Sequence, residues 1–520
     1  MTGPRRARWI PAAALIALAL AVTGCGSTEK KAATSASDTL RLPYLADMSV
    51  PDPDVFYDIE GNSVILNQYE GLLKYAPSST KIVGSLAESW TVSPDRLTYA
   101  FKLRPGVRFH SGAPLTAKAV EASFQRRLDV NQAPAYMLKP IKSTSTPDDR
   151  TFVVRLKRPV NPFEAYMASS WGPKIIGPDV IATHAGKDFG QRWMRTHGDG
   201  TGPYRLAAFD RGRQYLLERN DAYWGTKANF ERVLIKITPD IGTQRLELQN
   251  GDLDAVLHSF PASELASLPD SLKVQRSDSF LRLLLYVNTN RAPFDDPAVR
   301  AGLRSALDVD QLVDEAYAGT ATKSSGAYPE AILPDQPALP YAPDPAKARA
   351  AAGKARTKKI SLAYTADESG VQRRVGELLQ AQLKRAGYDV TLKEVQLPQV
   401  YGYVDRLKSA PDLLLMTNTP DAAHPDTWAR ILFSSRGGLN FLGSKDTQLD
   451  ALLDDALDAP AAEATKLYQQ VGRRAIDSNS IFFLGNVKDV FVLRKDLDGV
   501  EHVPAYPWTV SYAPLKRGAG

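Results

Sequence analysis

The chain has 520 residues, of which 43% are hydrophobic and 23% charged, as is ordinary for a globular protein. A chain of this length exceeds what one hydrophobic core normally organises, so two or three domains are expected. The formal charge of +6 falls to +3 without the three arginines of residues 1–24, which is too weak to indicate nucleic-acid binding. Cys25 is the single cysteine, so no disulfide can form within the chain.

The first 24 residues have the pattern of an export signal. Three arginines within residues 5–8 precede an uncharged stretch, residues 9–22, that is too short to span a bilayer. Small residues then lead to Cys25, and this leader resembles a bacterial lipoprotein signal. The resemblance implies cleavage before Cys25 and its lipidation, whereas the alternative is an ordinary cleaved signal with a chance cysteine. Residues 25–38 are small and polar, which predicts a flexible tether.

Strand and helix signals alternate in the first half of the chain. Residues 97–103 alternate polar and apolar side chains as a half-buried strand does, and Thr116 is a suitable N-cap for the helix that follows. Residues 233–237 predict a strand, and residues 241–249 predict a helix that ends at Gly251. These signals indicate one α/β lobe together with a strand-rich region.

The second half predicts another α/β lobe. Residues 280–287 are almost uniformly apolar, as in a strand covered on both faces. Asp296 and Asp308 each precede a helical run and predict two capped helices. Strand and helix signals alternate from residue 359 to the apolar run 412–416, which predicts a doubly wound sheet with that run as a central parallel strand.

Signs of catalysis and of metal binding are missing from the sequence. The six histidines are scattered without helical ligand spacing, so neither a metal site nor a cofactor is expected. The glycine-rich runs 198–202 and 438–445 depart from the dinucleotide-binding and phosphate-binding patterns and are interpreted as turns. No Gly-x-Ser-x-Gly elbow occurs. We therefore expect a protein that is not an enzyme, although carboxylates are too numerous for an acid pair to be excluded by counting.

Five stretches, taken in order, resemble the solute-binding proteins of peptide and nickel importers, the extracellular solute-binding family 5. They are residues 67–72, 86–117, 200–204, 288–300 and 449–453. The resemblance implies an α/β fold of the periplasmic-binding-protein type II-like class, in which two α/β lobes are joined by two crossover strands and an extra domain is inserted in the first lobe. It places the crossovers near Tyr286-Val287 and Leu484-Gly485.

The resulting domain organisation follows the chain in seven segments. They are a signal peptide at 1–24, a tether at 25–38, lobe I at 39–63, 191–285 and 486–520, an inserted domain at 64–190, and lobe II at 286–485.

The strongest ligand-site candidate is Asp421, which lies just beyond the predicted strand 412–416, where open α/β sheets bind ligands. The family's peptide binders have an aspartate at the matching position, which pairs with the peptide's α-ammonium. This chain keeps Asp421 and Pro425 of that segment, lacks its tryptophan and tyrosine, and has His424 where an acid is usual. The alternative is that Asp421 only caps a turn. Weaker candidates for the ligand site are Trp428, Tyr69, Asn440 and Phe441.

The function implied by the resemblance is capture of a peptide-like solute by domain closure, for an ABC importer. The expected partners are the permease and ATPase subunits and, through lipidated Cys25, the outer face of the cell membrane; a monomer is expected, and no nucleic acid. Alternatives are a nickel-chelate or oligosaccharide binder of the same family, a tethered secreted hydrolase, and a peptide sensor that feeds no importer.

Overall fold

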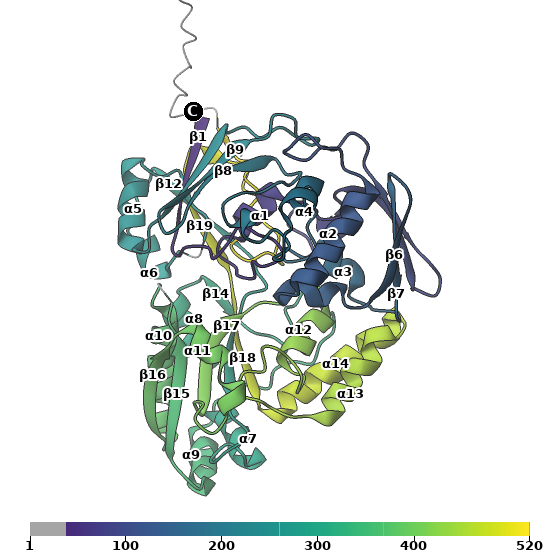
Figure 1. Ribbon diagram of the computed structural model, residues 1–520. Coiled ribbons are helices and arrows are strands. Elements are labelled where there is room, and N and C mark those ends of the chain that lie inside the picture. Colours follow the sequence, from purple (N-terminus) through teal and green to yellow (C-terminus); the bar gives the residue numbers. More distant parts are fainter. Residues whose placement is uncertain (1–37, 259, 368, 519–520) are drawn as a thin grey trace, which may run out of the picture. The chain divides into compact units, whose positions relative to one another are not determined.

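The structure is a computed structural model that describes residues 38–258, 260–367 and 369–518 (Figure 1). Its strands form several separate sheets, with helices between them, as the alternation of strand and helix signals predicts. The predicted signal peptide, Cys25 and nearly all of the predicted tether lie outside the described residues. Within the described part of the chain, no helix has the length and apolar character needed to cross a membrane.

Two sheets, which we call lobe I, are built from segments far apart in the sequence. The first has the order β1-β10-β9-β8, with strands Thr39–Tyr44, Arg232–Ile237, Gln214–Arg219 and Tyr204–Asp210. The second has the order β11-β19-β12, with strands Ala255–Val256, Asp489–Arg494 and Leu272–Ser277. Strands β1 and β10 pair in parallel, whereas β19 is antiparallel to both of its neighbours. The beginning, middle and end of the chain therefore share this lobe.

Short helices and ribbons complete lobe I. Helix α5 (Ile241–Asn250) ends at Gly251, whose φ of 80° allows the left-handed stop that the sequence predicts. The remaining elements are α1 (Asn62–Gln68), α4 (Pro178–His184), η3 (Trp193–Arg195), α6 (Ala262–Leu265), β20 (Leu497–Asp498) and β21 (Lys516–Arg517).

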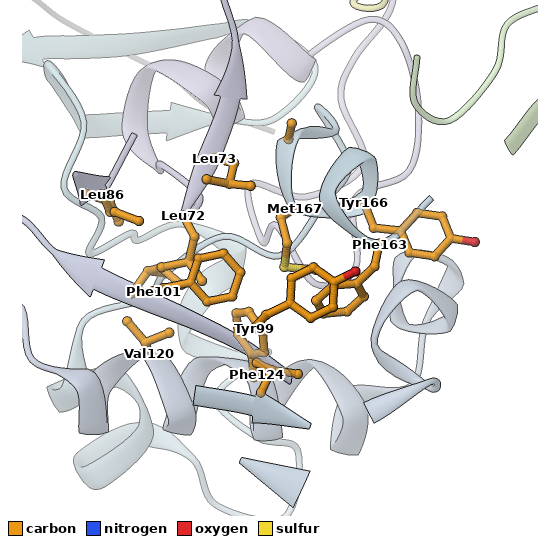
Figure 2. Packing of buried hydrophobic residues seen from close by; sticks show 14 of the residues in the cluster. Leu72, Leu73, Leu86, Tyr99, Phe101, Val120, Phe124, Phe163, Tyr166 and Met167 are labelled. Atoms are coloured by element: carbon orange, nitrogen blue, oxygen red, sulfur yellow. The ribbon is translucent and has the colours of Figure 1, made fainter. Parts of the chain in front are cut away.

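A third sheet, antiparallel and in the order β4-β5-β7-β6, forms what we call the inserted region. Thr116 caps α2 by accepting a hydrogen bond from the backbone of Ala119, so that prediction is confirmed. Figure 2 shows how Phe101 and Phe124 pack together with α3 residues Phe163 and Met167 in the core of this region. Its elements are β2 (Leu73–Tyr75), β3 (Ile82–Gly84), β4 (Ala87–Val92), β5 (Thr98–Leu103), α2 (Ala117–Val130), η2 (Ala133–Leu138), β6 (Ile141–Asp148), β7 (Thr151–Leu156) and α3 (Phe163–Ala168).

The largest sheet, with its helices, is what we call lobe II. Its order is β14-β18-β13-β17-β15-β16, with strands Ala321–Lys323, Ile481–Val487, Arg282–Val287, Leu413–Asn418, Lys359–Thr365 and Asp389–Val395. Strand β15 is parallel to β16 and β17, but β13 is antiparallel to β17 and β18. The run 412–416 overlaps β17, which is a central strand parallel to β15, as the sequence predicts, whereas the two strands that connect to lobe I run antiparallel to their neighbours.

Both faces of this sheet are buried. On β13, Leu283 and Leu285 belong to one hydrophobic cluster, whereas Leu284 and Tyr286 belong to another. This double burial explains the unbroken apolar run in the sequence. The covering helices are α7 (Pro297–Ala306), α8 (Val309–Tyr317), α9 (Pro345–Lys354), α10 (Val371–Arg385), α11 (Leu397–Tyr401), η4 (Val404–Arg406), α12 (Pro425–Leu432), α13 (Thr447–Asp458) and α14 (Ala461–Ser478).

The chain passes between lobe I and lobe II at two places. It leaves β12 after Ser277 and enters β13 at Arg282, and it returns from β18 to β19 through Lys488. The crossover positions expected from the resemblance, near Tyr286-Val287 and Leu484-Gly485, fall within β13 and β18, the lobe II strands next to these two passages. Apolar periodicity continues through these strands without interruption, so the sequence pattern contains no mark of the change of lobe.

Candidate functional site

Asp421 lies in the loop between β17 and α12, beyond the carboxyl end of a central strand. Its side chain is buried, with 4% of its surface exposed. His424 forms the N-cap of α12 by accepting a hydrogen bond from the backbone of Asp426, and Pro425 is the first helical residue. The loop is therefore held at both ends by regular structure, which gives Asp421 a defined position.

The hydrogen-bond partners of Asp421 come from lobe I and the inserted region. Tyr57 donates its hydroxyl to the carboxylate, 2.7 Å from each oxygen, and the hydroxyl of Tyr136 also donates to Oδ2. The backbone carbonyl of Asp421 accepts a hydrogen bond from the hydroxyl of Ser169. Two residues further on, the backbone N–H of Ala423 donates to the hydroxyl of Tyr75 at 2.9 Å. The Asp421 loop is thus a meeting point of lobe II with the rest of the protein.

The electrostatic environment of Asp421 is unusual, because none of the described lysine, arginine or histidine side chains forms an ion pair with it. Burial raises the pKa of Asp421 to about 6, although the hydrogen bonds from Tyr136 and Tyr57 act in the opposite direction. A buried carboxylate with hydrogen-bond donors but no cation is suited to receive a positive group from a ligand.

A cavity of about 80 Å³, which we call the interlobe cavity, lies beside the crossover strands. Lobe I contributes Phe260 and Trp508 to its lining, and lobe II contributes Gln372 and Thr417. The other lining residues are Leu45, Pro261, Ala262, Leu281, Tyr317, Thr320, Asp367, Ser369, Val371, Val487 and Lys488. Because its walls come from both lobes, a solute in this cavity would contact both at once.

Trp508 has a backbone conformation that a tryptophan rarely adopts. Its φ is 52°, in the left-handed region, which costs a bulky residue about 1–3 kcal/mol. The turn is stabilised by the buried Asp489, whose Oδ2 accepts from the backbone N–H of Trp508 at 2.8 Å and from Nε2 of His502 at 2.7 Å. Strain of this kind is concentrated at functional sites, and here it places an indole ring at the interlobe cavity.

The weaker candidates from the sequence lie in hydrophobic cores. Tyr69 is fully buried in lobe I, and Trp428 is fully buried in lobe II with its indole N–H donating to the carbonyl of Ala327 at 2.8 Å. Phe441 also packs in the lobe II core, while the amide of Asn440 bonds within its own loop to Ser434 and Ser444. Of the five candidates we keep only Asp421 in the proposed site.

The run 67–72 around Tyr69 and the glycine-rich run 198–202 have a structural role. Asn67 accepts from the backbone N–H of Tyr512 at 2.8 Å and donates to the carbonyl of Val510 at 3.0 Å, which attaches the C-terminal segment to α1. A Cβ on Gly200 would meet the carbonyl oxygen of Gln68 at 2.0 Å, so the glycine-rich run 198–202 permits a close backbone approach. These residues build lobe I.

His424 replaces the acid that the family resemblance leads one to expect. Burial lowers the pKa of its imidazole to about 4, so the ring is neutral at physiological pH. As the N-cap of α12, His424 accepts the backbone N–H of Asp426 at Nδ1, which requires that this nitrogen carry no proton, in agreement with a neutral ring. The described residues contain no cluster of three or more histidine, cysteine, aspartate or glutamate side chains suited to a metal ion.

Four residues of the site were missed by the sequence interpretation: Tyr57, Tyr136, Gln372 and Trp508. Tyrosine and glutamine occur many times in this chain, and none of the four stands in a motif that marks it. The Ser-Gly before Gln372 and the Pro before Trp508 are turn signals, but they do not indicate a ligand contact.

Comparison with known proteins decides the family. The model of the bacterial extracellular solute-binding proteins, family 5 Middle, matches residues 81–440. This chain belongs to family 5 of the bacterial extracellular solute-binding proteins. The resemblance read from the sequence is therefore confirmed, and with it a solute-binding role outside the cytoplasm.

Relatives of this family 5 protein agree along nearly its whole length. The probable D,D-dipeptide-binding periplasmic protein DdpA of Escherichia coli K12 is 29% identical over 474 residues, which cover 89% of this chain and 91% of that protein. Among solved structures, Helicobacter pylori DppA in complex with the peptide STSA has a TM-score of 0.80 and 23% identity, covering 92% and 98% of the two chains.

A structural neighbour with a different ligand has the same fold. Brucella suis NikA in complex with Fe(III)-EDTA has a TM-score of 0.81 and 20% identity, covering 92% of this chain and 99% of that chain. Such likenesses establish the two-lobe, type II-like fold. They do not choose the solute, because proteins of this fold bind chemically different ligands.

Proposed function

We propose that this family 5 protein is a lipid-anchored, extracytoplasmic component of an ABC importer that captures a peptide-like solute with a free amino group. The solute is enclosed between lobe I and lobe II by domain closure and passed to a membrane permease driven by ATPase subunits, without chemical conversion. The protein acts as a monomer, since one chain contains both walls of the interlobe cavity.

The observation that carries the proposal is the unpaired carboxylate of Asp421. It is buried, it has hydrogen-bond donors but no ion-pair partner among the described residues, and its pKa is raised to about 6. An α-ammonium group of a solute would supply the missing positive charge in a place where water competes little. The relative DdpA, a probable D,D-dipeptide-binding protein, and the structural neighbour DppA, in complex with a peptide, support the same ligand class.

Attachment to the membrane is the other part of the proposal. The run of small residues before Cys25 supports lipidation of that cysteine, and the polar segment up to Asp38 would serve as a leash. A lipid anchor keeps the binding protein close to its permease. The variant Cys25→Ala should lose membrane retention in cell fractionation and keep its affinity for the solute.

The decisive experiment compares a dipeptide with its blocked form on one variant. Asp421→Asn should weaken binding of Ala-Ala, measured by calorimetry, by a factor of about ten or more, because the ammonium loses its counter-charge. N-acetyl-Ala-Ala, which has no ammonium, should lose little. The matched control is Asp405→Asn, which removes an exposed carboxylate on η4 of lobe II and should change neither affinity.

Two results would contradict the proposal. Equal losses for the free and acetylated dipeptides would remove the ammonium role of Asp421. Mass spectrometry of solutes released from protein purified from its native cells offers an independent check, and recovery of sugars or metal chelates without peptides would overturn the ligand class.

A further inference from the structure

Two buried polar atoms at the interlobe cavity have no hydrogen-bond partner among the described residues. One is the indole nitrogen Nε1 of Trp508, which is a donor, and the other is the amide oxygen Oε1 of Gln372, which is an acceptor. They come from different lobes, because Trp508 belongs to the C-terminal part of lobe I and Gln372 lies in the first turn of α10 in lobe II. Other buried polar atoms of the described residues also lack a partner, but these two, a donor and an acceptor, line the same cavity, so one ligand group could satisfy both.

The side chain of Gln372 is held in place although its oxygen is free. Only 5% of its surface is exposed, its backbone N–H donates to Oδ1 of Asp367 at 3.2 Å, and its Nε2 lies 3.5 Å from the hydroxyl of Thr417. These contacts involve the backbone N–H and the side-chain nitrogen of Gln372, and the side-chain oxygen has no partner among the described residues. Thr417 lies four residues before Asp421, so the same strand end serves both places.

Trp508 is held in place in a corresponding way. Its backbone N–H is bound by Asp489, and its strained φ sets the direction of the side chain. Both side chains are therefore already ordered in the empty protein, so a ligand would not lose affinity to the entropy of ordering them, as is typical of preorganised binding sites.

The chemistry of the missing partner follows from this pair of atoms. A carboxylate would face the Gln372 oxygen without a proton to donate, and an ammonium would face the indole N–H without a lone pair to accept. We propose that the interlobe cavity binds an amide group of the solute, whose N–H donates to Oε1 of Gln372 and whose carbonyl accepts from Nε1 of Trp508. This inference rests on the proposed function, because it assigns a second contact to the same peptide-like solute.

The test compares Ala-Ala with alanyl-lactate, in which an ester oxygen replaces the peptide N–H. Wild-type protein should bind the amide about five to ten times more tightly than the ester, the usual effect of one neutral hydrogen bond. In Gln372→Met this ratio should fall to about one, because the acceptor is gone. In Trp508→Phe the affinity for both compounds should fall by a similar factor, because the indole donor is missing for either carbonyl.

A matched control and a second measurement separate binding from folding. Gln380→Met changes the same residue type on α10, where its Nε2 donates to the carbonyl of Val390 at 2.9 Å outside the cavity, and should leave the amide-to-ester ratio unchanged. Gln372→Met should lower the urea midpoint of the empty protein only slightly, because Oε1 has no partner to lose and the contact of Nε2 with Thr417 is long, at 3.5 Å. A large fall in that midpoint would indicate a structural role and overturn the assignment.

The outcomes distinguish this inference from the proposed function. If Ala-Ala binds and depends on Asp421, but the amide-to-ester ratio is the same in Gln372→Met and wild type, the amide contact is wrong and the proposed function stands. If Ala-Ala shows no binding to wild type at millimolar concentration, both are overturned for dipeptides.

Discussion

The guanidinium of Arg96 in the inserted region donates to the backbone carbonyl of Asp458 at the C-terminal end of α13 in lobe II. A second nitrogen of Arg96 reaches the carbonyl of Ala459 at 2.9 Å and the side chain of Asn161 at 2.7 Å. Asn161 itself donates to the carbonyls of Ala456 and Ala459 at 2.7 and 3.0 Å. The last carbonyls of a helix lack partners within the helix, and here another region supplies them.

Removal of this contact should favour separation of lobe II from the inserted region. Arg96 has a φ of 56°, so Arg96→Asn is the suitable variant because asparagine tolerates that conformation. Charge-assisted hydrogen bonds contribute about 1.5–3 kcal/mol each, so we expect an increased radius of gyration of the empty protein in small-angle scattering. Affinity for a probe dipeptide should fall about tenfold if closure is needed for binding.

The control for this experiment is Arg108→Asn, since the guanidinium of Arg108 bonds only to the carbonyl of Gly112 within its own turn, among the contacts of the described chain. It should leave the scattering profile unchanged. Identical profiles for Arg96→Asn and wild type would show that this contact does not hold lobe II against the inserted region.

The affinity for a free-amino solute should depend on pH through Asp421. The ammonium needs the charged carboxylate, and the pKa of Asp421 is raised to about 6 in the empty protein. Below pH 6 we therefore expect the dissociation constant of Ala-Ala to rise about tenfold per pH unit, with proton release on binding near pH 6. Calorimetry in two buffers of different ionisation enthalpy measures that release. A flat profile between pH 5 and 8 would contradict this role.

Asp421 should also make the stability of the empty protein depend on pH, in the direction opposite to the affinity: stability should fall as pH rises. The carboxyl group titrates near 3.8 in an ordinary setting and near 6 when buried in the fold, so the native state binds more protons between these values. Stability then falls as pH rises from 4 to 6, and Asp421→Asn should remove that fall. At pH 7 the variant should gain up to about 3 kcal/mol in the free energy of unfolding, measured with urea.

A buried ion-pair network attaches the inserted region to lobe I. Asp54 accepts from Arg126 at 2.6 Å and from Arg127 at 2.7 Å, and all three side chains are almost completely buried. Asp54→Ala should lower the free energy of unfolding by about 3–5 kcal/mol, because it leaves buried charge uncompensated. Glu218→Ala, which breaks the exposed pair with Arg205, should cost less than about 1 kcal/mol in the same urea experiment.

Arg282 in β13 is a buried cation without a carboxylate partner among the described residues. Its guanidinium donates to the carbonyl of Gly326 and lies over the ring of Phe483, while Nε and Nη1 are unpartnered. Burial lowers the pKa of this guanidinium, which stays protonated at pH 7 and is therefore a buried charge without a counter-charge. Arg282→Met should be more stable at pH 7 by about 1–4 kcal/mol in urea unfolding, because it removes that buried charge.

Local structure was predictable where neighbouring residues decide it. The Thr116 cap, the Gly251 stop and the Asp296 cap each depend on a side chain and backbone groups within a few positions, so their signals are written in the sequence. Strands such as β13 and β15 were recognisable because burial leaves a periodic or continuous apolar pattern.

The sequence by itself therefore determined the elements, the α/β class and, through ordered motifs, the family and the candidacy of Asp421. Only the tertiary structure brought Tyr57 to Asp421 across 364 positions, paired the lobes at the interlobe cavity, and placed Trp428 in a core. The physical reason is that long-range contacts arise from packing of whole sheets and helices, and no local periodicity records which side chains that packing leaves with an unpaired charge or an unpaired hydrogen-bonding atom.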